Sequence, residues 1–267
     1  MSYPMKYNYH THTPLCRHAD GDEEEYVQTA INGGKEILGF SDHSPMIFNS
    51  DHYSGYRMYP ADTEKYFDKL LSLREKYKDY IRILIGLELE YYPTTFDQTL
   101  KFLSAFPLDY LIIGEHFCDE DEEKYSGSIG EDSDQLHLYF ERILTALRTG
   151  KDLYPAHPDL ARYSGPEEIY EKEARAFCEE VKKLGYPLEI NFLGLMDGRH
   201  YPCDRFFRIA AEVGNKVIFG CDAHRPEYVN ERGVLKAGSE FVDRIGLELC
   251  DGMTIFDGYQ NPLEGIR

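Results

Sequence analysis

Short apolar runs alternate with amphipathic segments along the whole chain. The runs have the length of buried β-strands, whereas the segments between them repeat their apolar residues at helical spacing. The pattern predicts strands at residues 5–9, 36–41, 82–90, 109–115, 153–156, 187–192 and 216–221. It predicts helices near residues 23–33, 62–78, 95–105, 133–149, 166–184, 202–213 and 234–249. Asp22 with Glu25 fits a capping box for the first helix, and Gly185 fits the C-cap of the fifth.

Seven strand-then-helix units in succession predict a mostly parallel sheet, because each crossover helix returns the chain to the same end of the sheet. The compact closed form of such an α/β fold is a TIM-like (β/α)7 barrel, and an open doubly wound sheet is the alternative. No linker rich in Pro, Gly or Ser divides the chain, so we expect residues 1–267 to form a single domain. Both folds place functional side chains at the carboxyl ends of the strands.

The composition limits the classes of partner. A chain of 267 residues with 42% hydrophobic residues can fill a large core. Its formal net charge of −19 argues against nucleic acid, whose phosphates are bound by surfaces rich in Lys and Arg. The same charge repels small anions, so an anionic substrate needs local positive charge such as bound metal ions. No run approaches the roughly 18 apolar residues of a membrane span.

The cysteines bear on the compartment. Six are scattered with no C-x-x-C spacing: Cys16, Cys118, Cys178, Cys203, Cys221 and Cys250. The chain also has no N-terminal apolar segment of the kind found in secretion signals. Both observations favour the reducing cytoplasm. The sequence carries no signal for the oligomeric state.

Imidazole and carboxylate side chains gather where the predicted strands end. Six of the seven strands contribute them: His10, His12, His43, Glu88, His116, His157, Asp222 and His224. Alternate residues of a strand point to the same side, so His-Thr-His and Asp-Ala-His each direct two side chains into one pocket. The same alternation turns Asp42 and Glu115 away, which favours supporting roles for these acids. Glu90 shares the face of Glu88, and its role stays open.

One histidine at a strand end is more often structural than a ligand. Burying many such groups unpaired would cost several kcal/mol each, by a rough estimate, whereas metal coordination satisfies them. Imidazole and carboxylate ligands suit Zn, Mn or Fe. A set of this size exceeds what one ion takes, so the sequence indicates two or three divalent ions.

The segments "HTHT", "FSDH", "GLELE", "GEHF", "AHPD" and "GCDAH", in this order, resemble the polymerase and histidinol phosphatase (PHP) superfamily. The resemblance covers nearly the whole chain. The opening "HTHTPLCRHAD", with His18 six residues after His12, is most similar to the PHP-type histidinol-phosphate phosphatases of histidine biosynthesis.

This resemblance implies a distorted seven-stranded barrel with three divalent ions, Zn, Mn or Fe and possibly mixed. It implies that His10, His12, Glu88 and Asp222 hold the first ion, that Glu88, His116 and His157 hold the second, and that His18, His43 and His224 hold the third. It also implies basic residues that grip phosphate, for which Arg162 and Arg199 occupy suitable places, although each could instead form a surface ion pair. His52 and His200 lie in loops over the same rim, and the Tyr-rich segment 50–60 is either a cover for the pocket or a packed surface loop.

The predicted activity is hydrolysis of a small phosphate monoester. We expect a hydroxide bridging two ions to attack phosphorus, and we identify no general acid for the leaving group. The resemblance implies L-histidinol phosphate as the substrate, with nucleotides or phosphotyrosine as the alternative within the superfamily. An amidohydrolase would usually carry a metal-bridging lysine at a strand end, and this sequence has none there. A non-catalytic module often loses ligands, whereas this chain keeps the whole set.

Overall fold

The computed structural model describes residues 5–51, 53–118, 124–230, 232–257 and 259–266. Each of the seven predicted strands is present, and their bounds are β1 Tyr7–Asn8, β2 Ile37–His43, β3 Arg82–Leu89, β4 Tyr110–Ile113, β5 Asp152–Pro155, β6 Leu188–Asn191 and β7 Lys216–Gly220. An eighth strand, β8, covers Glu248–Leu249. The pattern of apolar positions therefore located the strands correctly but missed the last one.

The helices are α1 Glu23–Asn32, α2 Thr63–Tyr77, α3 Phe96–Leu103, α4 Ser133–Arg148, α5 Glu167–Leu184, α6 Phe192–Asp197, α7 Asp204–Val213 and α8 Arg232–Ile245. The capping box of Asp22 and Glu25 is confirmed, and so is the left-handed cap at Gly185. The sequence missed one helix and placed the end of another wrongly. The short helix α6 was not expected, and the last helix ends at Ile245 because Gly246 adopts a φ of 83°.

All strand pairs are parallel, which confirms the α/β class. The strands form a five-stranded sheet of order β1-β2-β3-β4-β5 and a three-stranded sheet of order β6-β7-β8. The prediction of one seven-stranded sheet is corrected to this extent: the described residues form two ladders with seams between them. At one seam Thr11 bridges Ala223 in parallel. At the other, the backbone N–H of His157 donates to the Glu189 carboxylate at 2.8 Å.

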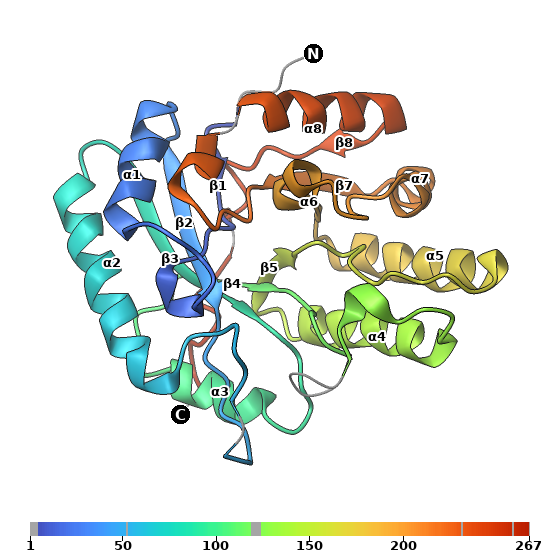
Figure 1. The fold of residues 1–267 in the computed structure, drawn as a ribbon, viewed down its shortest axis with the longest axis horizontal. Helices are drawn as coiled ribbons and strands as arrows, with labels where there is room; N and C mark the ends of the chain where they lie inside the picture. The colour runs from blue at the N-terminus through green and yellow to red at the C-terminus, as the bar shows by residue number, and fades with distance from the viewer. Residues whose placement is uncertain (1–4, 52, 119–123, 231, 258, 267) are drawn as a thin grey trace.

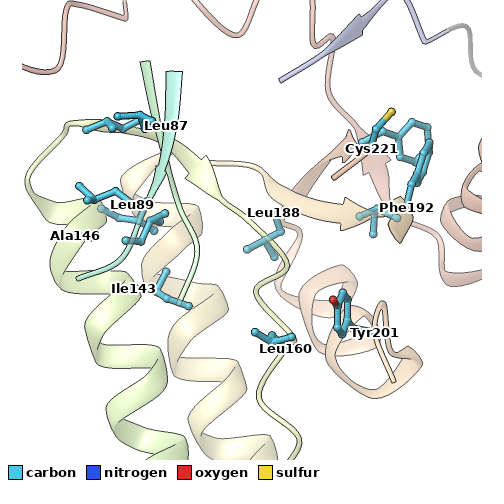
Figure 2. Close-up of a cluster of buried hydrophobic side chains, with 14 of the residues drawn as sticks. Leu87, Leu89, Ile143, Ala146, Leu160, Leu188, Phe192, Tyr201 and Cys221 are labelled. Atoms are coloured by element: carbon cyan, nitrogen blue, oxygen red, sulfur yellow. The ribbon is translucent and has the colours of Figure 1, made fainter. Parts of the chain in front are cut away.

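The helices pack around the outside of the strands (Figure 1). A large apolar layer lies between strands and helices, and Figure 2 shows part of it, where Leu87 and Leu89 of β3 lie beside Ile143 and Ala146 of α4. This layer explains the helical spacing of apolar residues, because each helix buries one stripe against the sheet. No helix among the described residues is long and apolar enough to cross a membrane.

A second apolar cluster lies on the inner side of the strands. This inner cluster consists of Tyr7, Tyr9, Ile37, Leu84, Tyr110, Ile112, Leu153, Tyr154, Ala156 and Ile218. The segment 250–259 packs against it through Cys250, Met253, Ile255, Phe256 and Tyr259. The Tyr9 hydroxyl donates to the carbonyl of Gly252 at 2.6 Å. The amino-terminal ends of the strands are thus filled by apolar side chains, which leaves the carboxyl ends for polar chemistry.

Candidate metal centre

The Glu88 carboxylate, at the carboxyl end of β3, lies at the centre of the polar cluster. Its Oε2 atom is 3.0 Å from His43 Nδ1 and 3.6 Å from the Nε2 atoms of both His10 and His12. Its Oε1 atom is 2.9 Å from His157 Nε2 and 3.8 Å from His116 Nε2. Imidazoles from β1, β2, β4 and β5 therefore converge on one carboxylate.

Asp222 forms the second centre of the cluster. Its Oδ1 atom is 3.1 Å from His12 Nε2, 3.5 Å from His10 Nε2 and 3.4 Å from His224 Nδ1. His18, which comes from the loop after β1, places its Nε2 atom 2.9 Å from His224 Nε2. The structure thus brings together the eight residues selected by strand alternation and also His18, which came from the resemblance alone.

Many of the buried nitrogen and oxygen atoms of the cluster have no hydrogen-bond partner among the described residues. The unpartnered buried atoms include His10 Nε2, His12 Nδ1 and Nε2, His43 Nδ1, His157 Nδ1 and Glu88 Oε2. A native fold rarely leaves so many buried polar atoms unsatisfied in one place. Several triads, such as His10, His12 and Asp222, hold their ligand atoms within 4.8 Å of one another. This donor set fits divalent metal ions.

A ring of carboxylates supports the inner imidazoles. Glu189 of β6 lies 2.8 Å from His10 Nδ1, and Glu90 lies 3.1 Å from His116 Nδ1. Asp42 Oδ1 lies 3.4 Å from His12 Nδ1 without a hydrogen bond between them, so the supporting role of Asp42 stays a prediction. The hydrogen bonds to His10 and His116 fix which ring nitrogen carries the proton and which is available to a metal ion.

Sequence reasoning missed Glu189, because β6 ends in no histidine. The signal that could have found it is the pair Glu189 and Asn191 in "LEIN", two polar residues in alternation within a buried strand. Asn191 donates through Nδ2 to Glu189 at 2.9 Å and to Asp222 at 3.1 Å. Glu115, by contrast, faces away and accepts from the backbone N–H of Tyr91 at 3.0 Å.

The backbone is adapted to the cluster at two ligand candidates. His157 adopts a φ of 28° and Asp222 a φ of 49°, a region that residues other than glycine rarely occupy. Such strain persists only where the surroundings impose it, and it gathers at functional sites. Gly114 has a related role, since a Cβ atom built there would lie 2.0 Å from Glu88 Oε1.

The charges within the cluster are strongly coupled. Burial alone would raise the pKa of Glu88, but the imidazoles of His116, His10 and His43 hold it well below its usual value. Burial and the neighbouring His12 hold the pKa values of His43 and His224 well below 6.5. These last two imidazoles are therefore neutral at pH 7, the form in which histidine binds metal ions.

A cavity of about 480 Å³ opens beside the cluster. It is lined by His18, His43, Tyr56, His116, Phe117, Tyr125, Leu193, Asp197, Arg199, Tyr201, Asp222, His224, Arg225 and Tyr228. Arg199 donates to Asp197 Oδ2 through Nε and Nη2 and to the Tyr201 hydroxyl through Nη1 at 2.8 Å. The cavity thus combines candidate metal ligands, a held guanidinium and several aromatic rings.

Most of this chain matches a known protein family. A family model described as the PHP domain matches residues 8–192. The chain belongs to the PHP family. The PHP match ends before Asp222 and His224, although both side chains lie in the same cluster as the residues inside it.

Named relatives of this PHP chain are phosphatases. A Deinococcus radiodurans protein named "Probable histidinol-phosphatase" is 30% identical over 239 residues, which are 84% of this chain and 88% of that protein. The histidinol-phosphatase of Bacillus subtilis is 26% identical over 81% of this chain and 92% of its own length.

Solved PHP structures share the fold. The crystal structure of a histidinol phosphate phosphatase from Lactococcus lactis, in complex with zinc, L-histidinol and phosphate, has a TM-score of 0.67 and 19% identity. The alignment covers 91% of this chain and 95% of that chain. At this identity the likeness shows a common fold.

The remaining predicted residues lie at different places around the PHP site. Arg199 lines the cavity, whereas Arg162 is exposed and is not among the lining residues. His200 Nε2 lies 2.7 Å from the carbonyl of Leu160, and His52 lies outside the described residues. Tyr56 of segment 50–60 lines the cavity, and whether the segment covers the pocket stays a prediction.

Proposed function

We propose that this protein is a metal-dependent phosphatase that hydrolyses L-histidinol phosphate to L-histidinol and phosphate. The observation that carries the proposal is the convergence of nine imidazole and carboxylate side chains beside a cavity that also contains Arg199. Two relatives carry the name histidinol-phosphatase, which supports the same substrate. The reaction is that of a phosphoric monoester hydrolase with a small-molecule substrate.

The centre holds three divalent ions in this proposal. His10, His12, Glu88 and Asp222 hold the first, Glu88, His116 and His157 the second, and His18, His43 and His224 the third. The distances around Glu88 and Asp222 support the first two groups, and the 2.9 Å approach of His18 to His224 supports the third. Among Zn, Mn and Fe, the zinc bound in the structural neighbour favours zinc. Bound divalent ions supply neutralisation of phosphate charge and a lowered pKa for water.

The chain's own residues would bind and orient the substrate. The Arg199 guanidinium is held by Asp197 and Tyr201 and has further N–H donors beyond these contacts for phosphate oxygens. Arg162 remains a proposed second phosphate contact from the exposed rim. The rings of Tyr56, Phe117 and Tyr228 line the cavity and provide flat faces for an imidazole.

The proposal treats β1 to β7 as the strands of one distorted (β/α)7 barrel and residues 1–267 as a single PHP domain. The Thr11–Ala223 bridge and the Glu189–His157 hydrogen bond support closure, because each spans a seam between the two ladders. Asp222 and His224 support the single domain, because the cluster needs residues from both sides of position 192.

The alternative is a PHP phosphoesterase that acts on nucleotides or on phosphotyrosine. A phosphate-release assay with L-histidinol phosphate, a 3′,5′-bisnucleotide and phosphotyrosine separates these substrates. Elemental analysis of protein purified without chelator measures the ions in the same sample. We expect about three ions per chain and a preference for L-histidinol phosphate. A preference for another substrate removes the proposed one, and full activity without metal removes the mechanism.

A further inference from the structure

Arg57 is a fully buried arginine close to the metal centre. Its side chain is fully buried and is among the largest fully buried side chains of the described residues. Its Nη1 atom donates to the carbonyl of Ser44 at 2.7 Å, and Nε donates to the Ser54 hydroxyl at 3.2 Å. A guanidinium stays charged in any environment, so a buried one needs an anionic partner and a complete set of acceptors.

The anionic partner is Glu90, and Glu90 also touches a ligand candidate. Arg57 Nη2 lies 3.0 Å from Glu90 Oε1, and the same oxygen lies 3.1 Å from His116 Nδ1. The Tyr56 hydroxyl donates to this oxygen at 2.6 Å, and the Tyr92 hydroxyl donates to Oε2. Glu90 is therefore a junction where the segment around Arg57 meets the imidazole of β4.

The segment that carries Arg57 is also tied to the loop that carries His18. Arg17 lies between His12 and His18 and donates through Nε and Nη2 to the carbonyl of Arg57, at 3.1 and 2.9 Å. Its guanidinium lies 4.2 Å above the Tyr59 ring and donates to that hydroxyl at 2.7 Å. Two contacts therefore connect residues 53–59 to the metal centre: the ion pair of Arg57 with Glu90 and the hydrogen bonds from Arg17.

The contacts of residues 53–59 also position one wall of the cavity, which Tyr56 lines. The Tyr56 ring lies edge-on to the His43 ring, with centroids 5.1 Å apart, and 5.2 Å from the Phe117 ring. Arg57 Nη2 donates to the Tyr56 hydroxyl, so the same guanidinium that fixes Glu90 also fixes the ring that faces the cavity.

We propose that Arg57 is a positioning residue of the metal centre. It fixes the Glu90 carboxylate so that His116 donates its Nδ1–H to Glu90 and turns Nε2 toward Glu88, and it holds Tyr56 against His43. The proposal rests on the proposed function, because His116 is a ligand only if the centre binds metal. Contacts beyond the ligands order metal sites in this way and typically change metal affinity about 10- to 100-fold when removed.

The test replaces Arg57 and follows the metal rather than activity alone. Arg57→Met removes the charge and all five donors, and Arg57→Lys keeps the charge without the planar fork. The matched control is Arg205→Met, since Arg205 pairs with Glu167 and lies 3.4 Å above the Tyr170 ring, away from the lining residues of the cavity. The readouts are zinc per chain, the rate of zinc release to a chelator, and the proton position on the His116 ring by ¹⁵N NMR.

We expect Arg57→Met to release one equivalent of zinc about 10- to 100-fold faster, with a mixed proton position on His116, and Arg57→Lys to lie between it and the wild type. Arg205→Met should retain the wild-type release rate. If Arg57→Met does not fold, Arg57→Lys carries the test alone.

Wild-type release and an unchanged His116 signal in a folded variant overturn the proposal. An equal effect in Arg205→Met also overturns it, because the role would then be general stability. A wild-type protein that binds no zinc or does not hydrolyse L-histidinol phosphate instead contradicts the proposed function, so the two failures are distinguishable.

Discussion

Single carboxylates hold several strands in register around this centre. Glu189 accepts from the backbone N–H of His157 at 2.8 Å, lies 2.8 Å from His10 Nδ1 and accepts from Asn191 at 2.9 Å. These partners come from the ends of β5, β1 and β6. One side chain therefore spans the gap that backbone hydrogen bonds leave open between β5 and β6.

We expect Glu189→Gln to lower the affinity for metal about 10- to 100-fold. The amide keeps the shape but has one acceptor atom and no charge, so it cannot serve His10 and His157 together. Chelator competition followed by elemental analysis measures the change. Glu173→Gln is the control, because Glu173 contacts the exposed ring of His137. Equal affinities in the two variants would contradict a supporting role for Glu189.

Arg199→Met should lower kcat/KM for the phosphate monoester about 10- to 100-fold, which corresponds to the loss of one charge-assisted hydrogen-bonded contact. Metal content should stay at the wild-type value, because Arg199 touches Asp197 and Tyr201 rather than the imidazoles. Steady-state kinetics and elemental analysis test both statements. Arg175→Met, which removes an exposed partner of Glu212, serves as the control. Unchanged kinetics in Arg199→Met would remove Arg199 from substrate binding.

Alternation of side chains along a strand predicts some of the residues in the cluster and misses others. Alternation correctly grouped His10 with His12, but it could not say which side they face. Tyr7 and Tyr9 belong to the inner cluster, so strict alternation would turn both histidines outward. Both nevertheless face Glu88 and Asp222, because the regular strand ends at Asn8 and strict alternation does not hold beyond it. The role of Glu90 was left open and Glu189 was missed, because both roles depend on partners far away in sequence.

At the scale of the elements, close approach between strands determines where side chains fit. Gly114 follows β4, and a Cβ atom there would lie 2.0 Å from Glu88 Oε1 of the neighbouring β3. Gly220, at the end of β7, has the same relation to Glu189 Oε1 at 1.8 Å. At both places a glycine, which has no side chain, leaves space for the carboxylate of the neighbouring strand.

We expect Gly114→Ala to displace the Glu88 carboxylate and to abolish stoichiometric metal binding while the fold persists. The added methyl group has no space unless Glu88 moves. Circular dichroism reports the fold, and elemental analysis reports the metal. Gly55→Ala is the matched control, because no atom of the described residues lies within 4 Å of a Cβ atom at that position. Normal metal content in Gly114→Ala would show that Glu88 is not needed where it lies.

The elements that the sequence predicted best are those with the strongest apolar periodicity. The five-residue and longer strands and the long helices were located within a few residues. The sequence missed α6 and β8, which are short, and Gly246 was absorbed into a helix that it in fact ends. β8 fell inside the helix predicted over 234–249, and α6, with six residues, is too short for apolar residues to repeat at helical spacing.

On the scale of the whole molecule, the two ends of the strands differ in polarity. The carboxyl ends carry the imidazoles and carboxylates, and the amino ends carry the inner cluster and segment 250–259. Asp152 is an exception, since it lies at the start of β5, is buried, and neither carboxylate oxygen has a hydrogen-bond partner among the described residues. Burial raises the pKa of this carboxyl from 3.8 to about 7.

Asp152→Asn should therefore stabilise the protein at pH 8 and have little effect near pH 4. Between pH 3.8 and about 7 the folded chain keeps the Asp152 proton while the unfolded chain loses it, so stability falls as the pH rises through this window. The gain at pH 8 is on the order of 2 to 4 kcal/mol. Urea unfolding at both pH values measures it. A gain of the same size at pH 4 would show that titration is not the cause.

Segment 250–259 has a consequence for biosynthesis. Tyr9 and Tyr110, made early, acquire their contact with Phe256 only when the ribosome has passed that codon. A nascent chain that pauses earlier therefore exposes the apolar side chains of the inner cluster to solvent. We expect chaperones to bind the nascent chain most strongly at that stage.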